Sequence, residues 1–192
     1  MSHDEGQSLD NVSAGHGLTG VLLVGGASRR FGSPKALARL DGETLADRAW
    51  RVLDEACDEV LAVGKSADGL QLPFPVLDDG SELRAAIVGV IAGLRAAAHD
   101  VVVLLPVDCP LMTPAAARAL GEAVAVPQTG PLPGAYSRPM LPELEARLKN
   151  GRLSLRGVNR TVLHLDEDLL ADVDTPAELA ALARATAATR DG

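Results

Sequence analysis

The chain has 192 residues, 47% of them hydrophobic, which suits one globular domain with its own packed core. Its net charge of −8 excludes nucleic acid or an anionic membrane surface as the main partner, because phosphate contacts require an excess of Lys and Arg. Two cysteines without a CxxC pair exclude a disulfide framework and a structural zinc site. No apolar run is long enough to span a membrane, and residues 1–17 are polar and lack a signal peptide's apolar stretch. We therefore predict a cytoplasmic protein with a disordered arm at residues 1–17.

Residues 18–24 are predicted to form a short buried strand that leads into a glycine-rich loop. The loop from Gly25 to Lys35 contains three glycines, two arginines and a lysine. Glycine permits close backbone approach, and successive exposed N–H groups form an anion-binding concavity. Arg30 and Lys35 are then candidates for neutralising phosphate oxygens; the alternative is a surface turn with solvated charges. The loop is neither a Walker A loop nor a GxGxxG loop, which disfavours a Rossmann dinucleotide site.

A helix is predicted next at residues 44–57, where apolar residues recur on one face at helical spacing. Strands are expected at 59–64 and 75–77, and the second of them ends at Asp78-Asp79. A helix is expected over 81–98 with Ser81 as its N-cap. For Asp78-Asp79, a solvated turn and a ligand site are both open.

Residues 101–107 are almost all branched apolar residues, which is typical of a strand buried on both faces in a parallel sheet. Asp108 stands at the end of this strand. Mg²⁺ takes hard oxygen ligands, commonly one or two carboxylates plus substrate phosphates. Asp108 is therefore a candidate metal ligand, the alternative being a turn cap or the partner of an arginine. We interpret Cys109 beside it as a packing residue.

A helix is expected to open at Thr113-Pro114, with Thr as N-cap and Pro at the first helical position. The further elements in chain order are short strands at 124–126 and 134–136, a helix at 141–148, a strand at 161–165 and a helix from 175 to about 187. Thr175 to Glu178 forms a capping box before that last helix. Residues 188–192 are predicted to be a flexible tail.

Strands that alternate with helices indicate an α/β fold with three layers, a mainly parallel sheet flanked by helices, in a single domain at 18–187. Ligands bind outside the carboxyl ends of the strands in such sheets. Two of these ends carry Gly25-Gly26 and Asp108, which predicts that the two segments meet at one site.

Three segments resemble one known family. The pattern L-x-G-G-x-x-x-R-x-G-x-x-K, from Leu23 to Lys35, resembles the signature loop of the sugar-nucleotide-type nucleotidyltransferases. With its continuation into Leu40-Asp41-Gly42, it looks most like the molybdenum cofactor guanylyltransferases. The segment around Asp108 and the D-x-D-T-P segment from Asp172 to Pro176 resemble later motifs of that family. The resemblance covers residues 18–182.

The resemblance implies a Rossmann-like nucleotidyltransferase domain and a role for each matched residue. Arg30, Lys35 and Asp108 would be catalytic. Asp108 and Asp174 would hold Mg²⁺, with Asp172 as the alternative to Asp174. The nucleotide-binding residues would be Leu23, Val24, Gly25, Gly26, Arg30, Lys35, Asp79 and Asp108. Where the family has Gly-Pro-Leu-x-Gly, this chain has Ala85-Ala86-Ile87-Val88-Gly89, which leaves the identity of the base open.

The function that the resemblance implies is transfer of GMP from GTP to the phosphate of the molybdopterin cofactor, with release of pyrophosphate. Two alternatives stay open: cytidylyl or other nucleotidyl transfer to a small phosphorylated acceptor, and a nucleotide-binding regulatory protein with a degenerate site. The expected partners are GTP and a molybdopterin-type acceptor. Transient contact with molybdoenzymes or cofactor-synthesis proteins is also implied by the family.

Overall fold

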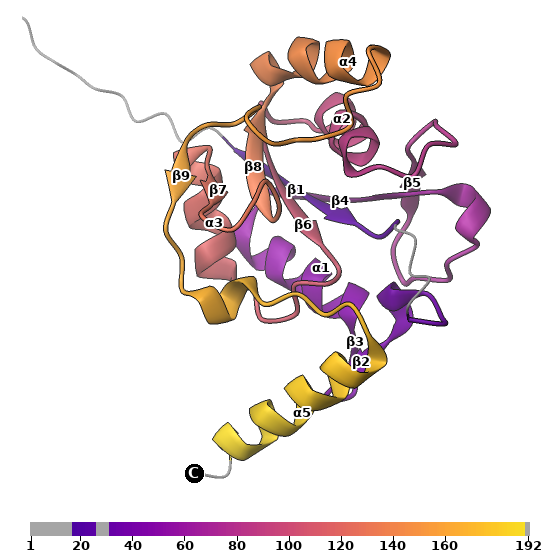
Figure 1. The fold of residues 1–192 in the computed structure, drawn as a ribbon, viewed down its shortest axis with the longest axis vertical. Helices are drawn as coiled ribbons and strands as arrows, with labels where there is room; N and C mark the ends of the chain where they lie inside the picture. Colours follow the sequence, from indigo (N-terminus) through magenta and orange to yellow (C-terminus); the bar gives the residue numbers. More distant parts are fainter. Residues whose placement is uncertain (1–16, 26–30, 191–192) are drawn as a thin grey trace, which may run out of the picture.

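The computed structural model describes residues 17–25 and 31–190, so the arm predicted for residues 1–17 falls outside it except for Gly17. The described chain builds a five-stranded central sheet in the spatial order β5-β4-β1-β6-β8 (Figure 1). Its strands are β1 (Leu18–Leu23), β4 (Glu59–Gly64), β5 (Val76–Asp78), β6 (Val101–Pro106) and β8 (Gly134–Ser137). The first four run parallel, and β8 pairs antiparallel with β6. The predicted mainly parallel α/β sheet is confirmed.

Helices cover both faces of the sheet and give the three predicted layers (Figure 1). One face carries α1 (Leu45–Ala56) and α3 (Pro114–Ala123), and the other carries α2 (Ala86–Ala96) and α4 (Leu141–Lys149). The last helix, α5 (Pro176–Arg190), extends away from the sheet and passes the expected end at residue 187. Among the described helices, none combines the length and the apolar composition that a membrane crossing requires. The division into an arm, one domain at 18–187 and a tail at 188–192 stays a prediction.

The neighbouring strands β1 and β6 place buried apolar residues on both faces of the sheet, and each face has its own core. Leu22 and Leu105 pack with buried residues of α1 and α3. Val21 and Leu104, their neighbours along the same strands, pack with buried residues of α2 and α4. Successive side chains of a strand point to opposite faces of a sheet, so consecutive apolar residues such as Val21 and Leu22 contribute to two different cores.

Shorter elements connect this frame. The described residues include two small sheets, β2 (Arg39–Leu40) with β3 (Glu43–Thr44) and β7 (Val126–Pro127) with β9 (Val162–Leu163). They also include four 3₁₀ turns, η1 (Lys35–Leu37), η2 (Ser66–Asp68), η3 (Arg138–Met140) and η4 (Glu167–Leu170). The strand predicted over 161–165 is shorter in the structure. Only Val162 and Leu163 form it, and they pair with Val126 and Pro127 of β7.

The predicted start of the second long helix is wrong. The helix begins at Ala86, and Ala85 caps it without a side-chain hydrogen bond. Ser81 lies in the preceding loop, where its carbonyl oxygen accepts a bond from Lys65 Nζ and its hydroxyl oxygen accepts one from the N–H of Leu83. These contacts compete with a helical backbone for the same polar groups, so residues 79–85 form a loop.

The carboxyl ends of β1, β4, β5 and β6 lie at one edge of the sheet, because these strands are parallel. The loops after β1 and β4 touch there backbone to backbone. A Cβ atom on Gly25 would lie 3.4 Å from the Cα of Gly64, and one on Gly64 would lie 2.7 Å from Cγ2 of Val24. Glycine at both positions permits this close approach.

Candidate active site

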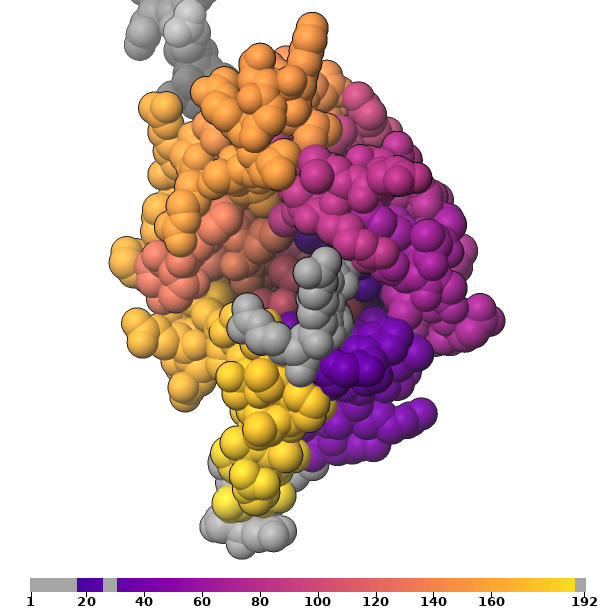
Figure 2. Space-filling view, turned by 45° about the vertical axis from the view of Figure 1, so that its right-hand side comes forward, coloured from indigo at the N-terminus to yellow at the C-terminus, as the bar shows by residue number. Residues whose placement is uncertain are grey.

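A cavity of about 710 Å³ opens at this edge of the sheet. It lies where α/β sheets place their ligands, outside the carboxyl ends of the strands. Figure 2 looks onto a hollowed face of the molecule, with the magenta and orange segments above the hollow and the violet and yellow segments below it. The described charged residues that line the cavity are Lys35, Lys65, Arg84, Asp79, Asp108, Asp172 and Asp174. Three cationic and four acidic groups therefore face one space.

Lys35 is the buried centre of a charge cluster in this cavity. Its Nζ lies 2.9 Å from Oδ1 of Asp174 and 3.3 Å from Oδ2 of Asp108. Lys35 is 8% exposed, whereas both carboxylates are partly exposed to solvent. Burial alone would lower the pKa of Lys35, but the hydrogen bonds and charges of Asp174 and Asp108 outweigh it, so the net pKa is raised. Lys35 is therefore a fixed cation at neutral pH.

The backbone brings the two carboxylates together. Asp108 follows the buried strand β6, and its carbonyl oxygen accepts a hydrogen bond of 2.9 Å from the N–H of Val173. On the other side of Val173, the N–H of Asp174 donates to Oε2 of Glu178 at 2.7 Å. Glu178 also accepts from the N–H of Thr175 and donates its own N–H to Thr175 Oγ1, which confirms the predicted capping box.

The donor set of this cluster fits Mg²⁺. Asp108 and Asp174 each present a carboxylate oxygen to the ammonium group of Lys35, so two carboxylates of the kind that Mg²⁺ takes as ligands lie close together. Among the described residues, no group of three or more His, Cys, Asp or Glu side chains is arranged to hold a metal. A site with two carboxylates still suits Mg²⁺, which commonly completes its shell with waters and substrate phosphates.

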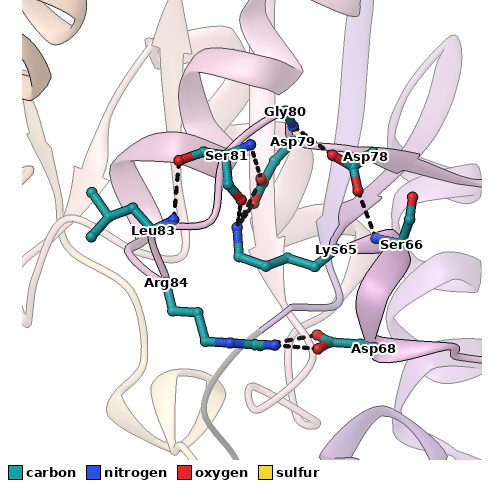
Figure 3. A network of polar contacts seen from close by, with 9 residues as sticks. All are labelled: Lys65, Ser66, Asp68, Asp78, Asp79, Gly80, Ser81, Leu83 and Arg84. Carbon is teal, nitrogen blue, oxygen red and sulfur yellow. Dashed lines mark hydrogen bonds and ion pairs between the residues drawn. The ribbon is translucent and has the colours of Figure 1, made fainter.

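A second pair of charges stands at the far wall of the cavity, between the ends of β4 and β5. Lys65 Nζ lies 2.8 Å and 2.7 Å from the two carboxylate oxygens of Asp79 (Figure 3). Both side chains are only 9% exposed. The neighbouring Arg84 pairs with Asp68 of η2, so the loop before α2 is tied to the segment after β4 at two points.

Most residues predicted for the site line this one cavity. They are Leu23, Val24, Gly25, Lys35, Asp79, Asp108, Asp172 and Asp174. Gly26 and Arg30 lie outside the described residues, so their predicted roles stay predictions. Nucleotide or metal binding by the residues that line the cavity stays a prediction as well. Asp174 accepts a hydrogen bond from Lys35, and Asp172 lines the same cavity. Either residue is therefore placed to be the second metal ligand beside Asp108.

The sequence analysis missed Lys65 and Arg84. The available signal for Lys65 was its place directly after a strand end at Gly64, the same signal that singled out Asp108. Leu132 also lines the cavity, whereas Tyr136 of β8 is fully buried and its hydroxyl group donates a hydrogen bond to the carbonyl oxygen of Pro131. Cys109 is buried and lies in one of the two hydrophobic cores, as its interpretation as a packing residue predicts, and burial raises its pKa.

Known proteins share both the sequence pattern and the fold. Residues 20–187 match the family model described as the MobA-like NTP transferase domain. A molybdenum cofactor guanylyltransferase of Desulfosudis oleivorans is 32% identical over 153 residues, which cover 73% of this chain and 76% of that one.

Two solved structures show the same fold at lower identity. The molybdopterin-guanine dinucleotide biosynthesis protein A of Archaeoglobus fulgidus superposes with a TM-score of 0.73 at 20% identity, covering 88% of this chain and 98% of that one. A 2-C-methyl-D-erythritol 4-phosphate cytidylyltransferase of Thermus thermophilus gives a TM-score of 0.64 at 17% identity, covering 87% and 97%. The fold alone therefore does not choose the base that is transferred.

The parallel sheet, its edge cavity and these matches define a nucleotidyltransferase. Within that class, the chain belongs to the family of MobA-like NTP transferases, together with the molybdenum cofactor guanylyltransferases.

Proposed function

We propose that the chain is a molybdenum cofactor guanylyltransferase, which transfers GMP from GTP to the terminal phosphate of a molybdopterin-type acceptor and releases pyrophosphate. The relative of that name at 32% identity supports the proposal. The observation that carries it is the cluster of Lys35, Asp108 and Asp174 in the cavity at the carboxyl edge of the sheet.

The reaction requires one bond to form and one to break at the α-phosphorus of GTP. An oxygen of the acceptor phosphate forms the new bond, and the bond to the bridging oxygen of the β-phosphate breaks, so pyrophosphate leaves with the electron pair. A phosphate nucleophile is already ionised at neutral pH, so no general base is required. Catalysis then depends on positioning and on neutralising charge.

Lys35 is suited to this task because it is buried, cationic and fixed by two carboxylates. We assign it to the α-phosphate, where negative charge builds up, and Arg30 of the glycine-rich loop to the outer phosphates. The remaining residues that face the cavity from β1 and its following loop, Leu23, Val24 and Gly25, would contact the base and ribose. Gly26 and Asp79 complete the proposed nucleotide contacts.

Mg²⁺ is part of the proposal, with Asp108 and Asp174 as its protein ligands. The described cavity wall has four carboxylates against three cationic groups, so a triphosphate meets repulsion there unless a cation intervenes. Bound Mg²⁺ would supply a template and a Lewis acid for the phosphate oxygens. Asp172 is the alternative second ligand.

The cell compartment and partners belong to the same proposal. We expect the protein to act in the cytoplasm, with GTP and the acceptor as small-molecule substrates. We also expect transient contact with molybdoenzymes or cofactor-synthesis proteins, since the family makes a cofactor that such proteins use.

The test is a turnover assay with purified protein, molybdopterin and Mg²⁺, in which GTP, CTP, ATP and UTP are compared for pyrophosphate release and dinucleotide product. Product from GTP alone is the expected result. Product from CTP in place of GTP would keep the chemistry and replace the guanylyl assignment with a cytidylyl one. Nucleotide binding without any product would overturn the enzymatic proposal in favour of a regulatory protein.

A further inference from the structure

The ion pair between Lys65 and Asp79 uses nearly all of the polar capacity of both side chains. Lys65 has three N–H donors, and its three hydrogen bonds go to the two oxygens of Asp79 and to the carbonyl oxygen of Ser81, the last at 2.6 Å (Figure 3). Lys65 therefore has no proton left to offer a ligand.

Asp79, in contrast, keeps one acceptor position. Among the described residues, its carboxylate accepts two bonds from Lys65 and one from the N–H of Ser81. A carboxylate has about four lone-pair sites. Because Asp79 lines the cavity, the remaining site is suited to a hydrogen-bond donor of the ligand.

The position of the pair relative to the catalytic cluster suits the two ends of a nucleotide. Asp79 follows β5 and Asp108 follows β6, and these strands are three inter-strand steps apart in the order β5-β4-β1-β6. At about 4.8 Å per step, the two strand ends stand roughly 14 Å apart. The cavity wall between them carries small residues, which leaves room for a planar base: Gly25, Gly64, Ala85, Ala86 and Gly89.

The surrounding loop is held by further contacts to the segment after β4 (Figure 3). Asp78 accepts from the N–H of Ser66 at 2.7 Å, and Arg84 bonds Asp68 at 3.1 Å and at a second, shorter contact. Together with Lys65, these bonds determine where the loop of residues 79–85 stands before α2 begins.

We infer that Lys65 is a positioning residue for base selection: it holds the carboxylate of Asp79 so that its one remaining acceptor site meets the 2-amino group of guanine. This inference rests on the proposed guanylyl transfer. Guanine carries an amino donor on C2, whereas adenine carries only a hydrogen there and cytosine presents a carbonyl oxygen at the corresponding edge. A carboxylate fixed at the cavity wall favours guanine, because an ionised acceptor binds an N–H donor strongly and is left unpaired by a base without that donor.

The test compares GTP with ITP, which lacks only the 2-amino group, in the parent protein and in Lys65→Met. The expected result is a rise in KM for GTP of about 10- to 100-fold, the range for losing a hydrogen bond to a charged group, with kcat at saturation close to the parent value. The preference for GTP over ITP should shrink towards one. Lys65→Arg, which keeps the charge and the donors, should recover most of the preference.

Two controls separate base selection from folding. Arg95→Met removes an exposed ion pair with Glu145, between α2 and α4, and should leave the GTP-to-ITP preference unchanged. Thermal unfolding shows whether Lys65→Met is folded at the assay temperature; if it is not, Lys65→Arg and Lys65→Gln carry the comparison.

The preference is also measured by titration calorimetry with GTP and ITP, which requires no turnover. An unchanged preference in folded Lys65→Met would overturn the inference and leave guanylyl transfer intact. No product from any nucleotide would overturn the proposed function instead, and calorimetry would still decide the role of Lys65.

Discussion

At the scale of single residues, Lys35 shows how a position known from a motif acquires its chemistry from distant partners. The motif indicated that Lys35 faces phosphate. The structure shows it 8% exposed and bonded to Asp108 and Asp174, which lie 73 and 139 residues further along the chain. No local pattern could predict that pairing, because it depends on how β6 and the segment before α5 converge.

Replacing Asp108 by Asn is expected to lower kcat for pyrophosphate release by about 10²- to 10³-fold, the usual loss when one charge-stabilising group is removed. The amide keeps the shape of the side chain but removes the charge that pairs with Lys35 and is proposed to bind Mg²⁺. The measurement is GTP-dependent pyrophosphate release at saturating substrate, with urea unfolding to check stability.

The matched control for this substitution is Asp54→Asn, an exposed carboxylate on α1. It should keep the parent rate. A parent-like rate in Asp108→Asn would remove Asp108 from the reaction.

At the scale of elements, the sequence predicted a helix N-cap correctly where the capping side chain bonds the helix backbone. It failed where a distant residue binds the backbone of the expected cap. Thr113 caps α3 by accepting from the N–H of Ala116, as its sequence pattern indicates. Ser81 carries the same kind of signal, yet it lies in a loop, because Lys65 binds its carbonyl oxygen. That competing bond comes from a residue 16 positions away, so the residues around Ser81 could not predict it.

Replacing Glu178 by Ala is expected to reduce both stability and activity. The free energy of unfolding should fall by about 0.5–2 kcal/mol, as for other lost helix caps. Because Glu178 also accepts from the N–H of Asp174, that carboxylate loses an anchor, and kcat/KM should fall by about 10-fold, as when the support of a ligand group is removed. Urea unfolding and the turnover assay measure the two effects.

Two control variants show whether the effect comes from the lost acceptor oxygen of Glu178. Glu178→Gln keeps an acceptor oxygen and should retain most of the activity. Glu122→Ala removes an exposed glutamate of α3 and should affect neither readout. Full activity in Glu178→Ala would show that Asp174 needs no support from the cap.

At the scale of the whole molecule, acid unfolding reports on the loop network beside the cavity. Hydrogen bonds from the backbone N–H of Ser66, and further bonds from the Ser66 side chain and the N–H of Gly80, lower the pKa of Asp78 from 3.8 to about 2. A depressed folded-state pKa means that the unfolded chain takes up this proton first as the pH falls. The stabilisation is therefore complete above pH 3.8 and is lost towards pH 2.

Asp78→Asn is expected to flatten the dependence of unfolding free energy on pH between pH 3.8 and about 2. Urea unfolding at several pH values across that window measures the slope. Ser66→Pro removes the main N–H donor at the first position of η2, where proline is tolerated, and should flatten the same window. Equal slopes in the parent and Asp78→Asn would show that these hydrogen bonds do not persist in solution.

The sequence by itself determined the fold class and most of the residues of the candidate site. Apolar runs at 18–24 and 101–107 specify strands buried on both faces, and spaced motifs place charged residues at strand ends, because these signals are local. The tertiary structure decided which charges pair: Lys35 with Asp108 and Asp174, and Lys65 with Asp79. It also decided where α2 begins. These features depend on the order of the strands in the sheet, which brings together groups that no local pattern connects.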